Sequence, residues 1–198
     1  VICNGDADRF EYLMNWLARM VQHPDEPGQV AVVLRSEEEG TGKGVFANAI
    51  VKMLGYVNAV AVSSPDHIVG RFNDHMRSKV FVFADEAFFA GSRETGRALK
   101  SIITEPTLTY EAKFRGAVTD KNRLHLMMAT NDEWAVPATR FARRFCVLDV
   151  PATRRNDRAY FGALIAQLDA GGYGAWLHDL LQRDVSDFNP QDFPRTEA

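Results

Sequence analysis

The order of hydrophobic and polar positions predicts helices that alternate with short, wholly apolar strands. Apolar residues recur at every third or fourth position over residues 8–21, which is the spacing of a helix with one buried face. Residues 30–34 are all apolar and follow a proline-glycine break, which is typical of a strand buried on both faces. Further strands are predicted at residues 56–62, 80–84, 124–129 and 145–150, and further helices at residues 45–55, from Ser64-Pro65 onward, and at 92–103, 157–168 and 175–181.

Two segments depart from this alternation. Residues 107–110 and 117–119 alternate apolar with polar side chains on either side of Arg115-Gly116, which predicts a β-hairpin. The last residues contain Pro190 and Pro194 but little periodic hydrophobicity, so we expect a frayed end.

Apolar strands that alternate with helices predict an α/β fold, with a largely parallel central sheet flanked by helices. Three segments are expected: an N-terminal helical extension at residues 1–28, a core at residues 29–150 and a C-terminal helical segment at residues 151–198. The first residue is Val1 rather than Met, which predicts a fragment of a longer protein.

Composition narrows the class of protein. The chain is 46% hydrophobic and 25% charged, which is typical of a folded domain and excludes a disordered tail or a collagen-like repeat. Its apolar runs are far shorter than the roughly 20 residues that span a bilayer, so no membrane segment is expected. The N-terminus resembles no secretory signal, and Cys3 and Cys146 lie far apart, so we expect a protein of the cytoplasm, that of the host if a phage encodes it.

The net charge of −3 conceals an uneven distribution. Basic residues gather in residues 97–123 and 140–158, whereas Glu37, Glu38 and Glu39 follow one another. A local basic surface is compatible with a polyanionic ligand, and solvated charged faces are the simpler alternative.

A glycine-rich turn with a lysine lies between a predicted strand and a predicted helix. Such a turn lets backbone N–H groups converge on phosphate oxygens, and the helix adds its positive end. Lys43 can reach the β- and γ-phosphates, so the loop predicts a site for ATP, although an ordinary strand-to-helix turn is the alternative. The expected phosphate-binding residues are Gly40, Thr41, Gly42, Lys43, Gly44 and Val45.

Polar residues also follow other predicted strands. Asp85 and Glu86 end the strand at residues 80–84, where the first can hold Mg²⁺ and the second can polarise an attacking water, unless the pair only caps a helix. Asn131 ends the strand at residues 124–129 and can hydrogen-bond a γ-phosphate or the water, although asparagine there is often a turn residue. Arg143 and Arg144 precede the last strand and can stabilise a phosphoryl-transfer transition state from a neighbouring subunit, or lie on the surface.

This ordered set of motifs resembles the superfamily 3 helicases, which are AAA+-like P-loop ATPases, and most of all the helicase domain of phage and prophage primase–helicase proteins. The resemblance covers roughly residues 10–150. It rests on the following segments: GTGKG at 40–44, FVFADE at 81–86, LKSIITEPTLTYEAKFR at 99–115, MMATN at 127–131 and RRF at 143–145.

The resemblance implies roles for these residues. Lys43 would be the Walker A lysine, and Asp85 and Glu86 would be the Walker B acids, with Asp85 on Mg²⁺. Asn131 would be sensor 1, and Arg143 or Arg144 would be an arginine finger acting in a ring, usually a hexamer. Lys113, Phe114 and Arg115 would form a hairpin tip that contacts single-stranded DNA, with Phe114 either stacking on bases or anchoring the hairpin to its neighbour.

Two positions depart from the Walker A pattern. Gly44 lacks the hydroxyl that usually binds Mg²⁺, and Glu37 stands where the pattern has glycine. Acidic residues at 37–39 would weaken phosphate binding unless their side chains point away.

The sequence therefore predicts an ATP-dependent DNA helicase domain of a phage-type replication protein, with a primase domain elsewhere in the same longer chain. Two alternatives remain at this point. One is a nucleotide-binding interaction module that hydrolyses ATP weakly or not at all, and the other is a small P-loop kinase.

Overall fold

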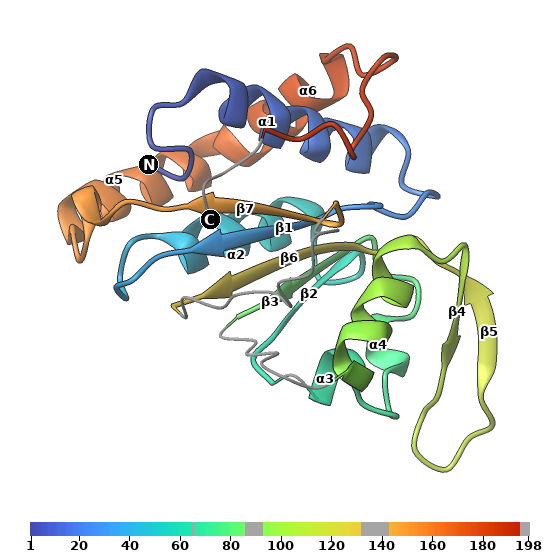
Figure 1. The fold of residues 1–198 in the computed structure, drawn as a ribbon. Helices are drawn as coiled ribbons and strands as arrows, with labels where there is room; N and C mark the ends of the chain where they lie inside the picture. The colour runs from blue at the N-terminus through green and yellow to red at the C-terminus, as the bar shows by residue number, and fades with distance from the viewer. Residues whose placement is uncertain (65, 86–92, 132–142, 195–198) are drawn as a thin grey trace.

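A computed structural model describes residues 1–64, 66–85, 93–131 and 143–194. Within these residues, five strands form a parallel sheet in the order β2-β3-β6-β1-β7 (Figure 1). Their bounds are Ala31–Arg35 for β1, Ala59–Val62 for β2, Phe81–Ala84 for β3, His125–Thr130 for β6 and Phe145–Asp149 for β7. The predicted α/β fold with a largely parallel central sheet is confirmed.

The central strands are apolar throughout because both faces of the sheet are covered. In β1, Val32 and Leu34 pack into the core on one face, whereas Ala31 and Val33 pack into the core on the other. The same alternation holds in β3, where Phe81 and Phe83 lie opposite Val82 and Ala84. This two-residue period follows from the pleat of a strand.

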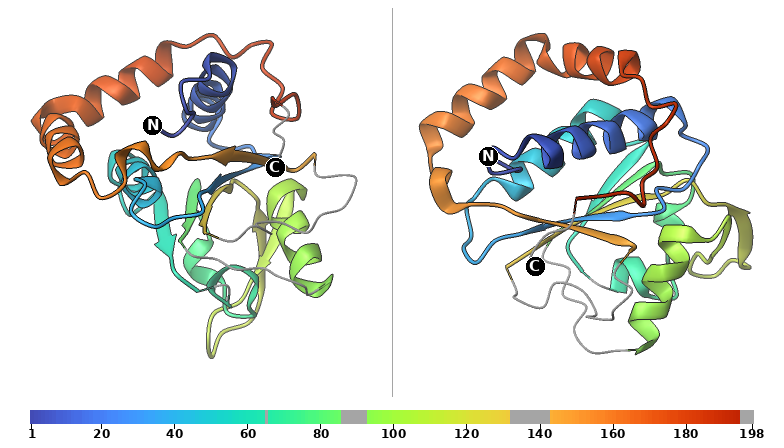
Figure 2. Two further views of the ribbon diagram at one scale, coloured as in Figure 1. Left: turned by 60° about the vertical axis from the view of Figure 1, so that its left-hand side comes forward. Right: turned by 45° about the horizontal axis from the view of Figure 1, so that its top comes forward.

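Helices cover the two faces of the sheet (Figure 2). One layer holds α1 (Ala7–Gln22), α2 (Lys43–Leu54), α5 (Arg158–Gln167) and α6 (Tyr173–Gln182), and the other holds α3 (Asp66–Val69) and α4 (Arg93–Thr104). Short helical turns lie at Asp74–Met76, Ala152–Arg154 and Leu168–Gly172. No helix in the described part of the chain has the length and apolar character needed to cross a bilayer.

The predicted hairpin is confirmed. Strand β4 (Thr107–Tyr110) pairs antiparallel with β5 (Val118–Lys121), so that Thr107 faces Lys121 and Tyr110 faces Val118. Tyr110 is buried and Leu108 is half-buried, as the alternating pattern predicts. The buried amide of Asn122 donates to the carbonyls of Ile102 and Glu105 over 2.8 Å each, which attaches the hairpin base to the end of α4.

Strand β2 is shorter than predicted. Tyr56 and Val57 lie in a turn before the strand and are 78% and 81% exposed. Gly55 ends α2 with φ +75°, and the amide of Asn58 donates back to its carbonyl over 3.0 Å. Tyr56 and Val57 are apolar but not buried, because the strand begins only after the glycine cap of α2 and the turn that follows it.

The expectation of a frayed C-terminal end is wrong for the described residues up to 194. The Tyr12 hydroxyl donates to the carbonyl of Pro190 over 2.7 Å. The rings of Phe188 and Phe193 lie 5.5 and 6.1 Å from that of Tyr12, between centroids. Aromatic packing on α1 therefore orders a segment without helix or strand, and a periodicity analysis cannot detect such packing.

Candidate functional site

Three polar residues, of which Asp85 and Asn131 were predicted, lie at one edge of the sheet. Ser36, Asp85 and Asn131 directly follow β1, β3 and β6. The strands are parallel and in register, with Arg35 beside Thr130 and Ala84 beside Met128, so their carboxyl ends meet. Figure 1 shows the loop from β1 to α2 at this same edge. Ligands of open α/β sheets bind at such an edge.

The loop before α2 needs glycine at two positions. Gly40 and Gly42 have φ values of +75° and +99°, a region that disfavours other residues. A Cβ on Gly40 would lie 2.2 Å from Oδ1 of Asn156, and one on Gly42 would lie 2.6 Å from the ring of Phe161. The pattern Gly-Thr-Gly is therefore explained both by backbone conformation and by the close approach of the start of α5.

Lys43 is held inside a polar cluster that consists of Ser36, Thr41, Lys43 and Asn131. Its side chain is only 7% exposed, and its ammonium donates to the Ser36 hydroxyl and, over 3.3 Å, to Oδ1 of Asn131. Thr41 donates to the same hydroxyl oxygen over 3.2 Å. The structure thus brings together the predicted Walker A lysine and sensor 1 asparagine.

The cluster keeps one unused donor. Nδ2 of Asn131 is buried and has no hydrogen-bond partner in the described part of the chain. Buried donors without partners are costly in folded proteins, and a ligand that brings an acceptor removes the cost. A phosphate oxygen beside Lys43 would satisfy it, so the residues present fit a nucleotide phosphate.

Asp85 lies beside the first turn of α2. A Cβ on Gly44 would be 3.9 Å from Oδ2 of Asp85, so this carboxylate faces the position where a Walker A hydroxyl would stand. Carboxylate oxygen is a ligand that Mg²⁺ prefers, so the position of Asp85 fits the metal role. Glu86, the predicted water-activating residue, lies outside the described residues.

The acidic residues before the loop differ in their surroundings. Glu38 forms an ion pair with Arg155, and its backbone carbonyl accepts from the Ser36 hydroxyl over 2.7 Å. The amide of Asn156 donates to the carbonyl of Gly40 over 3.0 Å. The segment before α5 therefore braces the loop and neutralises Glu38, while Glu37 and Glu39 are exposed to solvent.

An apolar cavity of about 650 Å³ adjoins the loop. It extends between the N-terminal segment, α2 and the helices α5 and α6. Gly42, Val45, Phe46, Tyr160, Phe161 and Trp176 are among its lining residues. Its apolar walls suit a flat, weakly polar group that is attached to the phosphate bound by the loop.

Arg143 and Arg144 lie at the opposite edge of the sheet. They directly precede β7, and the amide of Ala31 donates to the carbonyl of Arg144 over 2.8 Å at the start of β1. A five-residue strand separates the two edges by about 15 Å. Arg143 is exposed, and Nε of Arg144 is buried without a partner among the described residues. The structure does not bring either arginine to Lys43 of the same chain.

The hairpin tip presents the three residues predicted to contact DNA. Phe114 is 94% exposed with φ +66°, and the Lys113 ammonium lies 5.3 Å from the centroid of its ring. Lys113 and Arg115 are exposed, and neither has an ion pair within the described residues. Figure 1 shows that the hairpin extends from the sheet end opposite to the strand arrowheads.

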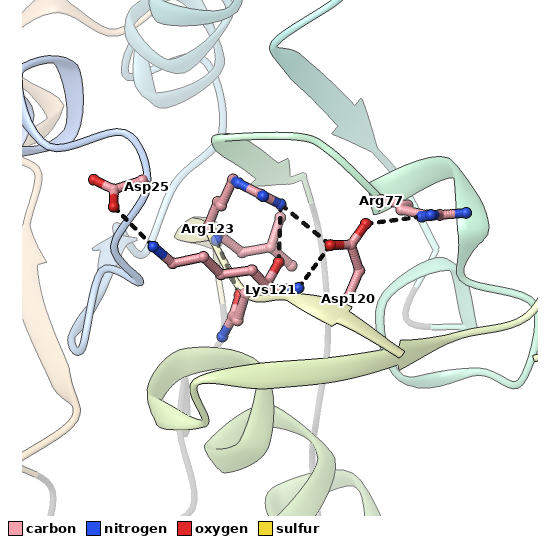
Figure 3. A network of polar contacts seen from close by, with 7 residues as sticks. Asp25, Arg77, Asp120, Lys121 and Arg123 are labelled. Atoms are coloured by element: carbon pink, nitrogen blue, oxygen red, sulfur yellow. Dashed lines mark hydrogen bonds and ion pairs between the residues drawn. The ribbon is translucent and has the colours of Figure 1, made fainter. Parts of the chain in front are cut away.

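The acids of the hairpin are neutralised by arginines from outside it. Glu111 accepts from Arg71 over 2.8 Å, and Asp120 accepts from Arg77 over 3.1 Å. These hydrogen bonds hold the pKa of both carboxyl groups below their usual values. Figure 3 shows Asp120 between Arg77 and Arg123. The cations at the tip are therefore the unbalanced charges of the hairpin.

Two residues that support the phosphate loop were not predicted from the sequence. Ser36 is an ordinary residue after a strand, and only its place directly after β1 could have indicated that it meets Lys43. Arg155 belongs to the predicted basic region at residues 140–158, but nothing in the sequence pairs it with Glu38.

Comparisons with known proteins agree with this fold. A model for a family of unknown function, DUF5906, matches residues 34–144. The apo structure of the NrS-1 C-terminal region superposes with a TM-score of 0.83 at 21% identity, covering 99% of this chain and 47% of that one. A JCV helicase crystallised with a small acetamide compound gives 0.50 at 17% identity, covering 89% and 57%.

The chain thus spans about half the length of these solved structures. Among curated proteins, none matches its sequence. At such identities the superpositions show a shared fold.

Proposed function

The chain belongs to the family of unknown function DUF5906, whose description states no activity, and we propose from the geometry that it is the ATPase core of a DNA helicase. The observation that carries this proposal is the contact between Lys43 and Asn131 beside Asp85, at the carboxyl edge of a parallel sheet. Its fold, shared with JCV helicase, and its ordered motifs support placement among the superfamily 3 helicases of phage-type replication proteins.

The site would bind ATP with its phosphates on the loop at residues 40–45. Lys43 would pair with the β- and γ-phosphates, and Nδ2 of Asn131 would donate to the γ-phosphate or to the attacking water. Asp85 would hold Mg²⁺, which supplies charge neutralisation for the phosphates. The apolar cavity beside Gly42 and Val45 would take the base.

Hydrolysis would need residues from two subunits. Glu86 is the proposed water-activating carboxylate. Arg143 or Arg144 would serve the site of a neighbouring subunit in a ring, for which the resemblance implies six copies, since neither arginine reaches Lys43 of its own chain. An arginine supplied in trans stabilises the charge of the phosphoryl-transfer transition state.

The hairpin tip would contact single-stranded DNA. Lys113 and Arg115 offer unbalanced positive charge, and Phe114 offers an exposed ring on which a base can stack. In a ring, several tips would converge on one strand, so few cations per chain suffice despite the net charge of −3. The domain would act in the cytoplasm, as part of a longer chain that also contains a primase domain.

The test is ATP turnover measured with and without single-stranded DNA, together with the size of the particle. A helicase core should hydrolyse ATP faster with DNA. A protein with Arg143→Ala and Arg144→Ala should bind ATP but fail to hydrolyse it, and should regain activity when mixed with a Lys43→Ala protein. No recovery in mixed assemblies that are shown to form would contradict a site shared between subunits.

Gly44 favours a second candidate function. Without a hydroxyl at this position, the site can bind nucleotide yet turn it over slowly, as a nucleotide-dependent interaction module would. Tight ATP binding with no turnover, with or without DNA, would favour this module over the helicase.

A further inference from the structure

The hairpin is held at a second place besides its base. Asn122 attaches the base to the end of α4. Residues 71–77, which include the helical turn Asp74–Met76 and are called the clip, contact both strands of the hairpin further along. On β4 the contacts reach Glu111, roughly 13 Å along the strand from Thr107.

The side-chain amide of Asn73 binds the hairpin as a piece of backbone would. Its Nδ2 donates to the carbonyl of Thr109 over 3.1 Å, and its Oδ1 accepts from the amide of Glu111 over 2.9 Å. The amide of Asp74 donates to the carbonyl of Glu111 over 3.3 Å. Backbone groups two residues apart lie on the same edge of a strand, so the clip pairs with one edge of β4 as a third strand would.

The local structure of the clip does not account for Asn73. Asparagine before a helical turn commonly caps it with its side chain. The side chain of Asn73, directly before the turn Asp74–Met76, makes no capping hydrogen bond there among the described residues. Both the oxygen and the nitrogen of this half-buried amide are used on the hairpin instead.

Ion pairs lie on either side of Asn73 in the clip. Nε of Arg71 donates to both carboxylate oxygens of Glu111, over 2.8 and 2.9 Å. Arg77 donates to Asp120 on β5 over 3.1 Å, as Figure 3 shows. The side chain of Arg71 is 75% exposed, and exposed ion pairs contribute little to stability. The half-buried amide of Asn73 is therefore the main attachment of the clip to β4.

Two separate attachments define the direction of the hairpin. A two-stranded hairpin on its own is only marginally stable, and one that is attached at its base alone can change its direction. The second attachment at residues 109–111 ends directly before the tip, where residues 113–115 are exposed. The clip thus limits the free part of the hairpin to the tip itself.

We propose that Asn73 is a positioning residue for DNA binding, which fixes the direction in which the tip residues 113–115 meet single-stranded DNA. Without this attachment the DNA would have to order the hairpin, and such ordering lowers affinity. In a ring the need is greater, because several tips must meet one strand. The inference rests on the proposed contact between the tip and DNA, and it adds a residue that does not touch the DNA.

The experiment measures the affinity of the chain for labelled single-stranded DNA over a range of salt concentrations. Asn73→Leu replaces one neutral side chain by another of similar size, so the charge of the hairpin is unchanged. Affinity should fall about fivefold at every salt concentration, because ordering the loosened hairpin costs binding free energy. The slope of log affinity against log salt should stay as in the wild type, because the same cations still contact phosphates. Nucleotide affinity should not change.

Hydrogen exchange shows whether the hairpin still forms in this variant. The amide of Glu111 donates to Asn73 and should exchange slowly in the wild type and quickly in Asn73→Leu. The amides that pair β4 with β5 should stay protected in both proteins. This pattern would show a hairpin that is folded but released from the clip.

Asn58→Leu is the matched control. Asn58 is exposed, and its Nδ2 donates to the carbonyl of Leu54 over 3.0 Å, at the end of α2. This variant loses a bond between a side-chain amide and a backbone carbonyl, but not at the hairpin. It should keep the wild-type affinity for DNA and the wild-type salt slope.

Three results would overturn the inference, and they separate it from the proposed function. If Asn73→Leu keeps the wild-type affinity while Lys113→Ala with Arg115→Ala weakens binding, the DNA contact stands and Asn73 does not position it. If Asn73→Leu lowers the salt slope as well and the amides between β4 and β5 lose protection, Asn73 only supports folding of the hairpin. If the Lys113→Ala, Arg115→Ala variant binds DNA as the wild type does, the proposed contact itself fails, and this inference with it.

Discussion

Lys43 at the phosphate loop and Lys113 at the hairpin tip have opposite surroundings. At the carboxyl edge, Lys43 is 7% exposed and is held by Ser36 and Asn131. At the hairpin, Lys113 is exposed and its described contact is the ring of Phe114. A buried, oriented ammonium suits one small anion of fixed geometry, whereas an exposed one suits a long polyanion that can approach in many ways.

In each region, one acid is paired with an arginine from outside that region. Glu38 pairs with Arg155, and Glu111 pairs with Arg71, so each acid meets an arginine from a distant part of the chain. The net charge of −3 therefore describes neither region. The difference between the two sites is in burial rather than in the number of charges, and this makes it open to test by substitution.

The largest effect is expected at the buried lysine. Lys43→Ala should reduce nucleotide affinity at least a hundredfold and abolish turnover, because the charge that faces the phosphates is lost from a site of low solvent access. DNA affinity of the isolated chain should not change. Titration with a fluorescent nucleotide and with labelled single-stranded DNA measures both.

Lys52→Ala is the control for Lys43→Ala. Lys52 lies on the same helix, α2, and its exposed ammonium pairs with Asp169 over 2.6 Å, far from the loop. It should leave nucleotide affinity unchanged. Equal losses in the two variants would mean that a general change in charge, rather than the Lys43 site, governs binding.

A smaller and graded effect is expected at the hairpin. Lys113→Ala with Arg115→Ala should lower affinity for single-stranded DNA about tenfold to a hundredfold at low salt. Each lost phosphate contact should reduce the slope of log affinity against log salt by about 0.7, so the pair should reduce it by about 1.4. Nucleotide affinity and basal hydrolysis should persist.

Lys100→Ala provides the comparison for the hairpin, since Lys100 is exposed on the neighbouring α4. It should change neither the affinity nor the salt slope. An unchanged DNA affinity in the double variant would make the hairpin structural and direct attention to the arginines at residues 154–158.

The fold was predictable to the extent that burial on both faces leaves a pattern in the sequence. Strands such as β1 and β6 were found because their central residues are all apolar, as burial on two covered faces requires. Tyr56 and Val57 were misassigned because an exposed turn can also be apolar. The ordered C-terminal end was missed because its packing depends on the distant Tyr12.

The site was predictable where backbone chemistry demands a residue type. Gly40 and Gly42 are required by positive φ values and by the close approach of α5. Lys43 begins the helix after the loop, and Asn131 directly follows a strand. Arg155 could not be assigned, because an ion pair between residues so far apart in the sequence has no local pattern. The roles of Glu86, Arg143 and Arg144 stay predictions.

The ion pair at the phosphate loop should have an effect of a few fold. Arg155→Ala should weaken nucleotide binding two- to fivefold, because both partners are about half exposed and such pairs contribute up to about 1 kcal/mol. The loss arises from an uncompensated Glu38 near the phosphates. Adding Glu38→Gln to Arg155→Ala should therefore restore the affinity, as isothermal titration would show. If the second substitution restores nothing, Arg155 contacts the nucleotide itself.

Substitution of His125, at the start of β6, should have the smallest effect on nucleotide and DNA binding, although this strand connects the two regions. Its expected effect is on the stability of the fold. Burial lowers the pKa of His125 to about 4, and its ring packs edge-on against Trp16 with centroids 5.4 Å apart. The unfolded chain binds a proton at this residue near pH 6.5, but the folded chain does not. Stability is therefore fully present above about pH 6.5 and is lost as the pH falls toward 4.

This linkage should lower the free energy of unfolding by about 2 kcal/mol between pH 7 and pH 5. His75, whose pKa burial also lowers, adds to the loss in the same direction. His125→Phe keeps a ring of similar size and cannot take up a proton, so it should flatten most of this dependence, whereas replacement of the exposed His178 by Phe should not. Urea unfolding at the two pH values measures the change. A pH dependence that persists in His125→Phe would place the responsible group elsewhere. Nucleotide and DNA affinities at pH 7 should not change in this variant. That result would show that a substitution at the amino end of β6 leaves Asn131, beyond its carboxyl end, undisturbed.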